Sequence, residues 1–151
     1  MSQLSDVKIP DLNAAILPGR SAAGIEIGSA MTESEVRPDS VRRLAGCTVF
    51  DFKSVSVWIK DGLVTQIGVH AAYEGALGQM IRIGSTLAEV SQWAGCKIIE
   101  DEEENLVLEC LPGCSFETSD WAGEEIKNNM NAPITWIFVC PASDSAARDP
   151  A

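Results

Sequence analysis

The strongest constraint on the fold is a set of short segments that occurs twice in the same order along the chain. The matched pairs are Ile25–Ser29 with Ile81–Ser85, Leu44–Cys47 with Trp93–Cys96, and Val64–Val69 with Ile134–Val139. Self-similarity at a spacing of about 50–60 residues indicates an internal repeat. The sequence therefore predicts two related units, preceded by an extension and followed by a tail. Their ranges are 1–19 for the N-terminal extension, 20–75 for unit 1, 76–141 for unit 2 and 142–151 for a disordered tail.

Each unit is expected to begin with a helix. In the second unit, Leu87, Val90 and Trp93 recur at helical spacing, and Gly95 is a favoured residue for ending a helix. This pattern predicts a helix over about 86–94. In the first unit Pro38 interrupts the pattern, which predicts a longer, broken helix whose second part ends at Gly46.

After each Ala-Gly-Cys the apolar pattern changes to the alternation that is typical of strands. The predicted strands are 48–52, 55–60, 64–70, 97–102, 105–110, 114–118 and 134–139, with short strands at 24–28 and 80–84. Asp61-Gly62 predicts a tight hairpin, and further turns are expected at 102–105 and 111–114. The fold class expected is α+β, a tandem duplication of a helix followed by an antiparallel β-meander in one compact domain. Whether the two half-sheets merge or face each other is left open.

Charge and composition exclude several classes of function. The net charge of −11 disfavours nucleic acid and anionic membranes as partners, because both would repel the chain. No apolar run approaches the roughly 18 residues that a membrane span needs. The N-terminal segment lacks the features of a secretory signal, so a cytoplasmic location is expected. The odd number of cysteines favours buried thiols, although Cys110 and Cys114, which flank a turn, are an alternative redox pair.

A search for catalytic chemistry finds no enzyme signature. His70 is the single histidine and has no cysteine cluster near it in the sequence, so it is interpreted as a surface residue at a strand end. Gly19 and Gly24 have the separation of a phosphate-binding loop, but no Lys-Ser or Lys-Thr follows them. We therefore expect no catalytic residues, no metal and no cofactor.

The acidic run at 100–104 is the most conspicuous polar feature. It has neither the alternating acids nor the central glycine of a calcium loop. Three interpretations are weighed: a solvated turn, an anionic finger that enters a basic pocket on a partner, and a general acid–base pair.

The four tryptophans have different expected positions. Trp93 lies on the apolar side of the predicted helix and is expected in the core. Trp58 and Trp136 lie in predicted strands, and the sequence does not decide whether each faces the core or the solvent. Trp121 lies in a polar loop, where it either contacts a partner or folds back to cover one end of the core.

Taken together, the segments 18–29, 55–75, 81–90, 100–118 and 134–139 resemble those of immunity proteins, the small cytoplasmic inhibitors encoded beside bacterial polymorphic or type VI secreted toxins. The repeat also resembles, more distantly, the helix-plus-sheet architecture of β-lactamase-inhibitor-like domains. The first resemblance implies a non-enzymatic protein that binds one cognate toxin and occludes its active site. A toxin with a basic cleft would suit an acidic inhibitor, because charge complementarity speeds association.

The expected toxin-binding residues are Glu100, Asp101, Glu102, Glu103, Glu104, Asp120, Trp121, Glu124 and Glu125. A rival hypothesis is a small-ligand-binding or enzymatic domain with its site between the two repeats. Its candidate residues are Arg20, His70, Tyr73 and Glu74. A third hypothesis is an adaptor or chaperone for a secreted partner.

Overall fold

The computed structural model describes residues 9–118 and 126–142. Its elements are β1 (Ser21–Ala22), β2 (Ile25–Glu26), α1 (Glu33–Val36), β3 (Ser40–Leu44), β4 (Cys47–Phe52), β5 (Val55–Lys60), β6 (Leu63–Val69), α2 (Leu87–Ala94), β7 (Ile98–Glu100), β8 (Leu106–Leu108), β9 (Leu111–Thr118), a 3₁₀ turn (Ile126–Asn129) and β10 (Ile134–Val139).

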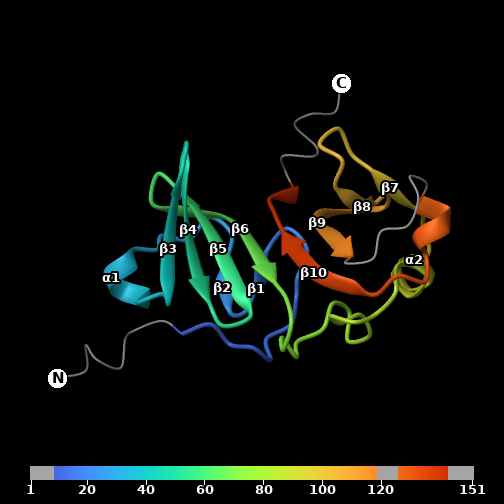
Figure 1. Cartoon of the computed structure of the whole chain (residues 1–151), viewed down its shortest axis with the longest axis horizontal. Helices are drawn as coiled ribbons and strands as arrows, with labels where there is room; N and C mark the ends of the chain where they lie inside the picture. The colour runs from blue at the N-terminus through green and yellow to red at the C-terminus, as the bar shows by residue number, and fades with distance from the viewer. Residues whose placement is uncertain (1–8, 119–125, 143–151) are drawn as a thin grey trace.

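One antiparallel sheet of eight strands dominates the molecule. Its strand order is β3-β4-β5-β6-β10-β9-β8-β7, and β1 and β2 form a separate two-stranded sheet. The two halves of the large sheet merge where β6 pairs with β10, with Val69 opposite Ile137. Figure 1 shows α1 beside β3 at one end of this sheet and α2 near β7 at the other end. The sheet is therefore continuous, which settles the question that the sequence left open.

The expected fold class, α+β by tandem duplication of a helix followed by a meander, is wrong. Within residues 9–118 and 126–142 the structure is mostly β, with 44% strand and 12% helix, and α1 has only four residues. The segment after Pro38, expected to continue the first helix, instead forms β3. There Val41 pairs with Phe50, and Leu44 pairs with Cys47 across a tight turn. The sequence Val-Arg-Arg-Leu is compatible with a helix and with a strand. Pairing with β4 stabilises the strand.

Other local predictions are confirmed. The helix expected over 86–94 is α2, capped by Thr86 and ended by Gly95 in the left-handed conformation. Asp61 and Gly62 both have positive φ and join β5 to β6, as the tight hairpin required. In contrast, the turn expected at 111–114 is part of β9, and the short strand expected at 80–84 contributes only an isolated bridge at Ile81.

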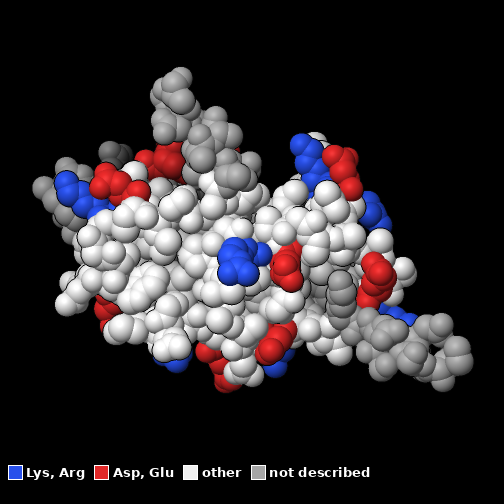
Figure 2. Space-filling model, turned by 180° about the vertical axis from the view of Figure 1, so that it is seen from behind, with Lys and Arg blue, Asp and Glu red and all other residues white. Residues whose placement is uncertain are grey.

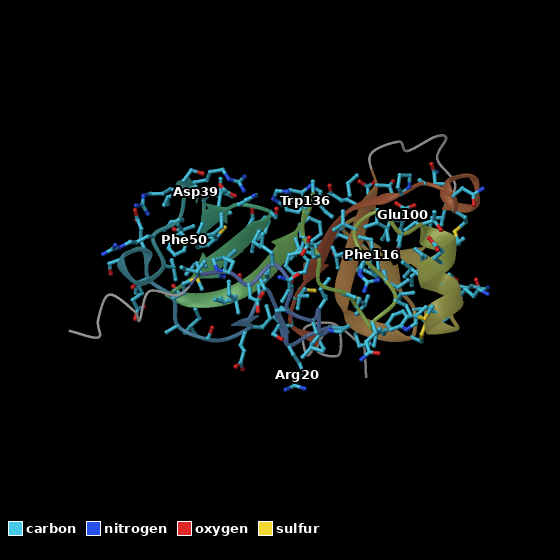
Figure 3. All side chains as sticks on the ribbon, turned by 90° about the horizontal axis from the view of Figure 1, so that it is seen from below. Arg20, Asp39, Phe50, Glu100, Phe116 and Trp136 are labelled. Atoms are coloured by element: carbon cyan, nitrogen blue, oxygen red, sulfur yellow. A yellow bond between two sulfur atoms is a disulfide. The ribbon has the colours of Figure 1, made fainter. Side chains whose placement is uncertain are left out.

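The buried core lies on one face of the sheet. Side chains such as Val57, Ile67, Ile137 and Phe116 point to that face and are almost fully buried. The N-terminal segment, with Ile16 and Ala22, packs against them. In Figure 3 this segment and Arg20 lie on the side of the sheet opposite Trp136. One face of the sheet is thus covered, and the other carries Trp136.

Tyr73 ties the N-terminal segment to the sheet. Its ring is buried, its hydroxyl donates to the carbonyl oxygen of Ala14 at 2.5 Å, and it accepts from the backbone N–H of Ala23 at 2.9 Å. Burial raises the pKa of Tyr73, so the hydroxyl stays protonated and keeps its donor. The residue expected as a loose ligand-binding candidate therefore has a structural role.

The expectation that all five cysteines are thiols is wrong. Cys96 and Cys110 form a disulfide, with their Cα atoms 6.0 Å apart. It links the segment after α2 to the turn between β8 and β9, and so closes a loop that contains the β7–β8 hairpin. Cys110 and Cys114, the alternative redox pair, are not joined, and burial raises the pKa of the Cys114 thiol to about 12.

Candidate functional site

A row of four aromatic rings crosses the uncovered face of the sheet. Trp58 on β5 meets the edge of Phe138 with ring centroids 6.0 Å apart, and Phe138 stacks on Trp136 at 5.3 Å. Trp136 in turn packs against His70, just after β6, at 4.1 Å. All four side chains are half-buried. We call Trp58, His70, Trp136 and Phe138 the aromatic row.

Gly68 on β6 leaves room for two rings of the aromatic row. It lies opposite Phe138 in the β6–β10 pair. A Cβ atom at this position would come within 3.0 Å of ring atoms of both Phe138 and Trp136. The missing side chain therefore leaves the space in which two rings from β10 lie across the neighbouring strand.

A charged pair borders the row on the β3–β4 side. Arg42 donates to both carboxylate oxygens of Asp51, from Nε at 2.7 Å and from Nη2 at 2.9 Å, and Ser56 donates to Asp51 at 2.7 Å. These hydrogen bonds, chiefly that from Arg42, hold the pKa of Asp51 below its usual value although partial burial opposes them. Arg42 is thus engaged within the protein.

An open cleft of about 590 Å³ lies between the β7–β8 hairpin and Trp58. Among the described residues that line it, five are acidic and none is Lys or Arg. The acidic residues are Glu100, Asp101, Glu102, Glu103 and Glu109, and they face Trp58, Thr65 and Gln66 across the cleft. Because Trp58 belongs to the aromatic row as well, the cleft and the row form one continuous surface.

The structure separates the acidic residues of the hairpin into different roles. The carboxylate of Asp101 accepts from the backbone N–H groups of Glu103 and Asn105, both at 2.9 Å, so it shapes the turn. Glu102 and Glu103 line the cleft, whereas Glu104 lines a separate hollow beside Phe116 and Glu117. The predicted turn at 102–105 is confirmed, and the acidic residues face two different sides.

The other predicted residues fall into two groups. Asp120, Trp121, Glu124 and Glu125 lie outside the described residues, as does the predicted tail from 143 onward. Of the candidates for a ligand site between the units, Arg20 lies on the covered side (Figure 3). His70 packs on Trp136 as part of the aromatic row. Glu74 is exposed and the hydroxyl of Tyr73 is used in the fold. These four residues do not converge.

Charge is unevenly arranged on the surface as a whole. Figure 2, a view from behind, shows acidic groups scattered over this face and its rim, with basic groups among them and wide uncharged areas between. Within residues 9–118 and 126–142, no set of three or more His, Cys, Asp or Glu side chains could hold a metal ion. In the same ranges, no helix has the length and apolar character that a membrane crossing requires.

The aromatic row was missed by sequence reasoning, which left Trp58 and Trp136 with no preferred face. The signal was present in the alternation of Trp136 and Phe138 along one strand, together with a glycine on the strand that pairs with it. Which strands are neighbours is decided by the sheet order, and the pairing of β6 with β10 joins segments about 70 residues apart.

His70 makes the stability of the row depend on pH. Burial lowers its pKa, and the negative charge of Asp51 offsets this only in part. The unfolded chain therefore binds the proton at a higher pH than the folded protein does. The free energy of unfolding is expected to be greatest above about pH 6.5 and to fall as the pH drops through that value.

Thermal unfolding measured between pH 7.5 and 5.5 tests this expectation. His70→Phe keeps an aromatic ring beside Trp136 but cannot titrate, so its midpoint should fall less over this range than that of the wild type. Equal slopes for the two proteins would contradict the assignment.

Comparisons with known proteins bear on the fold alone. No family model and no curated protein matches the chain. The chain is similar in structure to the uncharacterized protein yfeY from Escherichia coli, known from a crystal structure, with a TM-score of 0.54 and 13% sequence identity. The match covers 82% of this chain and 95% of that chain. At this identity, the likeness extends to the course of the backbone and no further.

Proposed function

We propose that this protein is an immunity protein, a non-enzymatic inhibitor that binds a cognate secreted bacterial toxin and occludes its active site. The observation that carries the proposal is the cleft beside Trp58, with five acidic and no basic side chains among its described lining residues. A surface of one charge sign on a protein of net charge −11 favours a partner of opposite charge. An exposed basic active-site cleft of a toxin has that property.

Binding would proceed in two physical steps. The acidic residues attract a basic partner over distances of about a Debye length, roughly 8–10 Å at physiological ionic strength, which raises the association rate. Contact with the cleft and the neighbouring sheet face then excludes water and slows dissociation. Inhibition follows if the partner's basic cleft is also its substrate-binding site, because inhibitor and substrate compete for the same charge.

A protection assay tests the proposal. The product of the gene adjacent to the one that encodes this chain is expressed in a bacterial host with and without this protein. We expect the neighbour alone to arrest growth, and coexpression to restore it through a complex that copurifies. Lack of toxicity, or toxicity that coexpression does not relieve, would overturn the proposal.

Charge variants of the hairpin test the acidic cleft. Glu102→Lys reverses one charge in the cleft, and Glu104→Lys makes the same change on the same hairpin in the other hollow. We expect Glu102→Lys to lower the association rate several-fold and to weaken its dependence on salt. Glu104→Lys should have a smaller effect. Equal effects of the two variants would assign the attraction to net charge rather than to the cleft.

The disulfide indicates in which cellular compartment the protein is found. The cytoplasmic location expected from the sequence stays a prediction, and the Cys96–Cys110 disulfide favours an oxidising compartment such as the periplasm, because disulfides are rare in the cytosol. Protein isolated from its native compartment under acid quench should show three alkylatable thiols in the unfolded state. Five alkylatable thiols would favour the cytoplasm.

A further inference from the structure

We propose that the aromatic row is the energetic centre of the partner interface, and that its occupant is a protein surface with an apolar patch bordered by basic side chains. The inference rests on the proposed function, because the partner is the same protein. It goes beyond the acidic residues, which attract the partner, and assigns most of the affinity to uncharged rings.

The position of the row supports this assignment. The covered face already supplies the core, with Ile67, Ile137 and Phe116 buried there. The rings of the row lie on the opposite face and are left half-buried. Tryptophan is enriched among the residues that dominate binding energy, and such residues lie near the centre of an interface whose rim is polar.

The row is also preorganised for binding. Its rings are held by three ring–ring contacts and by the close approach of two of them to Gly68. Side chains that are fixed before binding lose little conformational entropy when a partner covers them. The free energy gained when a partner buries these rings is therefore little reduced by a loss of conformational entropy.

Ring geometry and charge together identify the occupant. Trp136 stacks on Phe138 at an interplanar angle of 6° and packs against His70 at a tilted angle of 31°. Each contact covers part of a ring face, which disfavours a sugar ring or a lone cation, since both bind aromatic faces.

The residues that border the aromatic row indicate the charge of the partner surface. Glu117 is exposed and lies opposite Trp136 in the β9–β10 pair, and the acidic cleft adjoins Trp58. Arg42 is engaged by Asp51. A partner with basic side chains around its apolar patch complements this border, whereas a second copy of this chain, of net charge −11, would be repelled.

Binding of the purified product of the adjacent gene is measured by calorimetry with two truncation variants, Trp136→Ala and Phe138→Ala. We expect the dissociation constant to rise at least about 30-fold for each, as for interface hot spots. Gln66→Arg keeps every ring and adds a positive charge opposite Trp58 in the β5–β6 pair. It should weaken binding at least about 10-fold, and because Gln66 also lines the acidic cleft, this result tests the border that the cleft and the row share. Circular dichroism of Trp136→Ala and Phe138→Ala verifies that both variants fold, so that a loss of binding is assigned to the rings.

Met80→Ala is the matched control, because Met80 is an apolar side chain that is 66% exposed and lies outside the row. Its dissociation constant should stay within about threefold of the wild type. If the wild type binds and protects while Trp136→Ala and Phe138→Ala bind as tightly as the wild type, the inference fails and the proposed function stands. If the wild type does not bind, both fail. A wild-type dimer in light scattering that Phe138→Ala dissociates would instead make a second copy the occupant, and would overturn the inference.

Discussion

Phe116→Ala is expected to lower the free energy of unfolding by about 3–5 kcal/mol, the largest effect of any single truncation considered for this protein. Phe116 is 2% exposed on the covered face of β9, where it packs in the main core. Its removal loses the transfer free energy of the ring and leaves a cavity that the surrounding strands cannot close. Urea denaturation followed by circular dichroism measures the change.

Phe138→Ala provides the comparison, because it removes the same atoms from the other face of the adjacent strand. Phe138 is half-buried and contacts Trp58 and Trp136, so we expect a loss of about 1–2 kcal/mol from its aromatic pairs. The two variants should therefore separate stability from binding, with Phe116→Ala affecting the first and Phe138→Ala chiefly the second. Equal destabilisation would show that the uncovered face is a second core.

Removal of the Cys96–Cys110 disulfide is expected to cost about 3 kcal/mol, the value for a closed loop of roughly 15 residues. The two cysteines are 14 residues apart and enclose the β7–β8 hairpin. This hairpin depends on the link because β7 is a three-residue strand at the edge of the sheet and, among the strands that the structure describes, pairs only with β8. For a chain of 151 residues, the loss corresponds to a midpoint lower by about 6–12 °C.

Cys110→Ser tests this expectation in differential scanning calorimetry, and a reducing agent added to the wild type should produce a similar shift. Cys47→Ser is the control, because Cys47 is a half-buried thiol on β4. It should unfold within about 2 °C of the wild type. A shift as large for Cys47→Ser as for Cys110→Ser would show that the disulfide contributes no special stability.

Local structure was predictable wherever neighbouring residues decide it. The helix that begins after Thr86 and ends at Gly95 follows from its capping residues and its apolar spacing. The β5–β6 hairpin follows from Asp61-Gly62, because only residues that tolerate positive φ fit its two turn positions. Such signals extend over a few residues and need no tertiary partner.

The strand β3 shows where local reasoning fails. Its residues, Ser40–Leu44, follow a proline and contain two arginines, and nothing within the segment excludes a helix. Pairing with β4 satisfies the backbone groups on one side of β3 and fixes it as a strand. The resemblance between segments of the two halves suggested a repeated helix, yet residues that precede similar turns can adopt different structures when their pairing partners differ.

Some features of the candidate surface likewise follow from the sequence alone, and others depend on the tertiary structure. The sequence by itself determined the acidic run of the β7–β8 hairpin and its turn, because consecutive charged residues stay in water and Asp101 caps the turn locally. Only the tertiary structure decided that Glu102 and Glu103 line a cleft, that Cys96 meets Cys110, and that rings from β5, from β10 and from His70 just after β6 form one row. The physical reason is that strand order and register join distant segments, and a shift of register by one residue would move the strand side chains of the row to the opposite face.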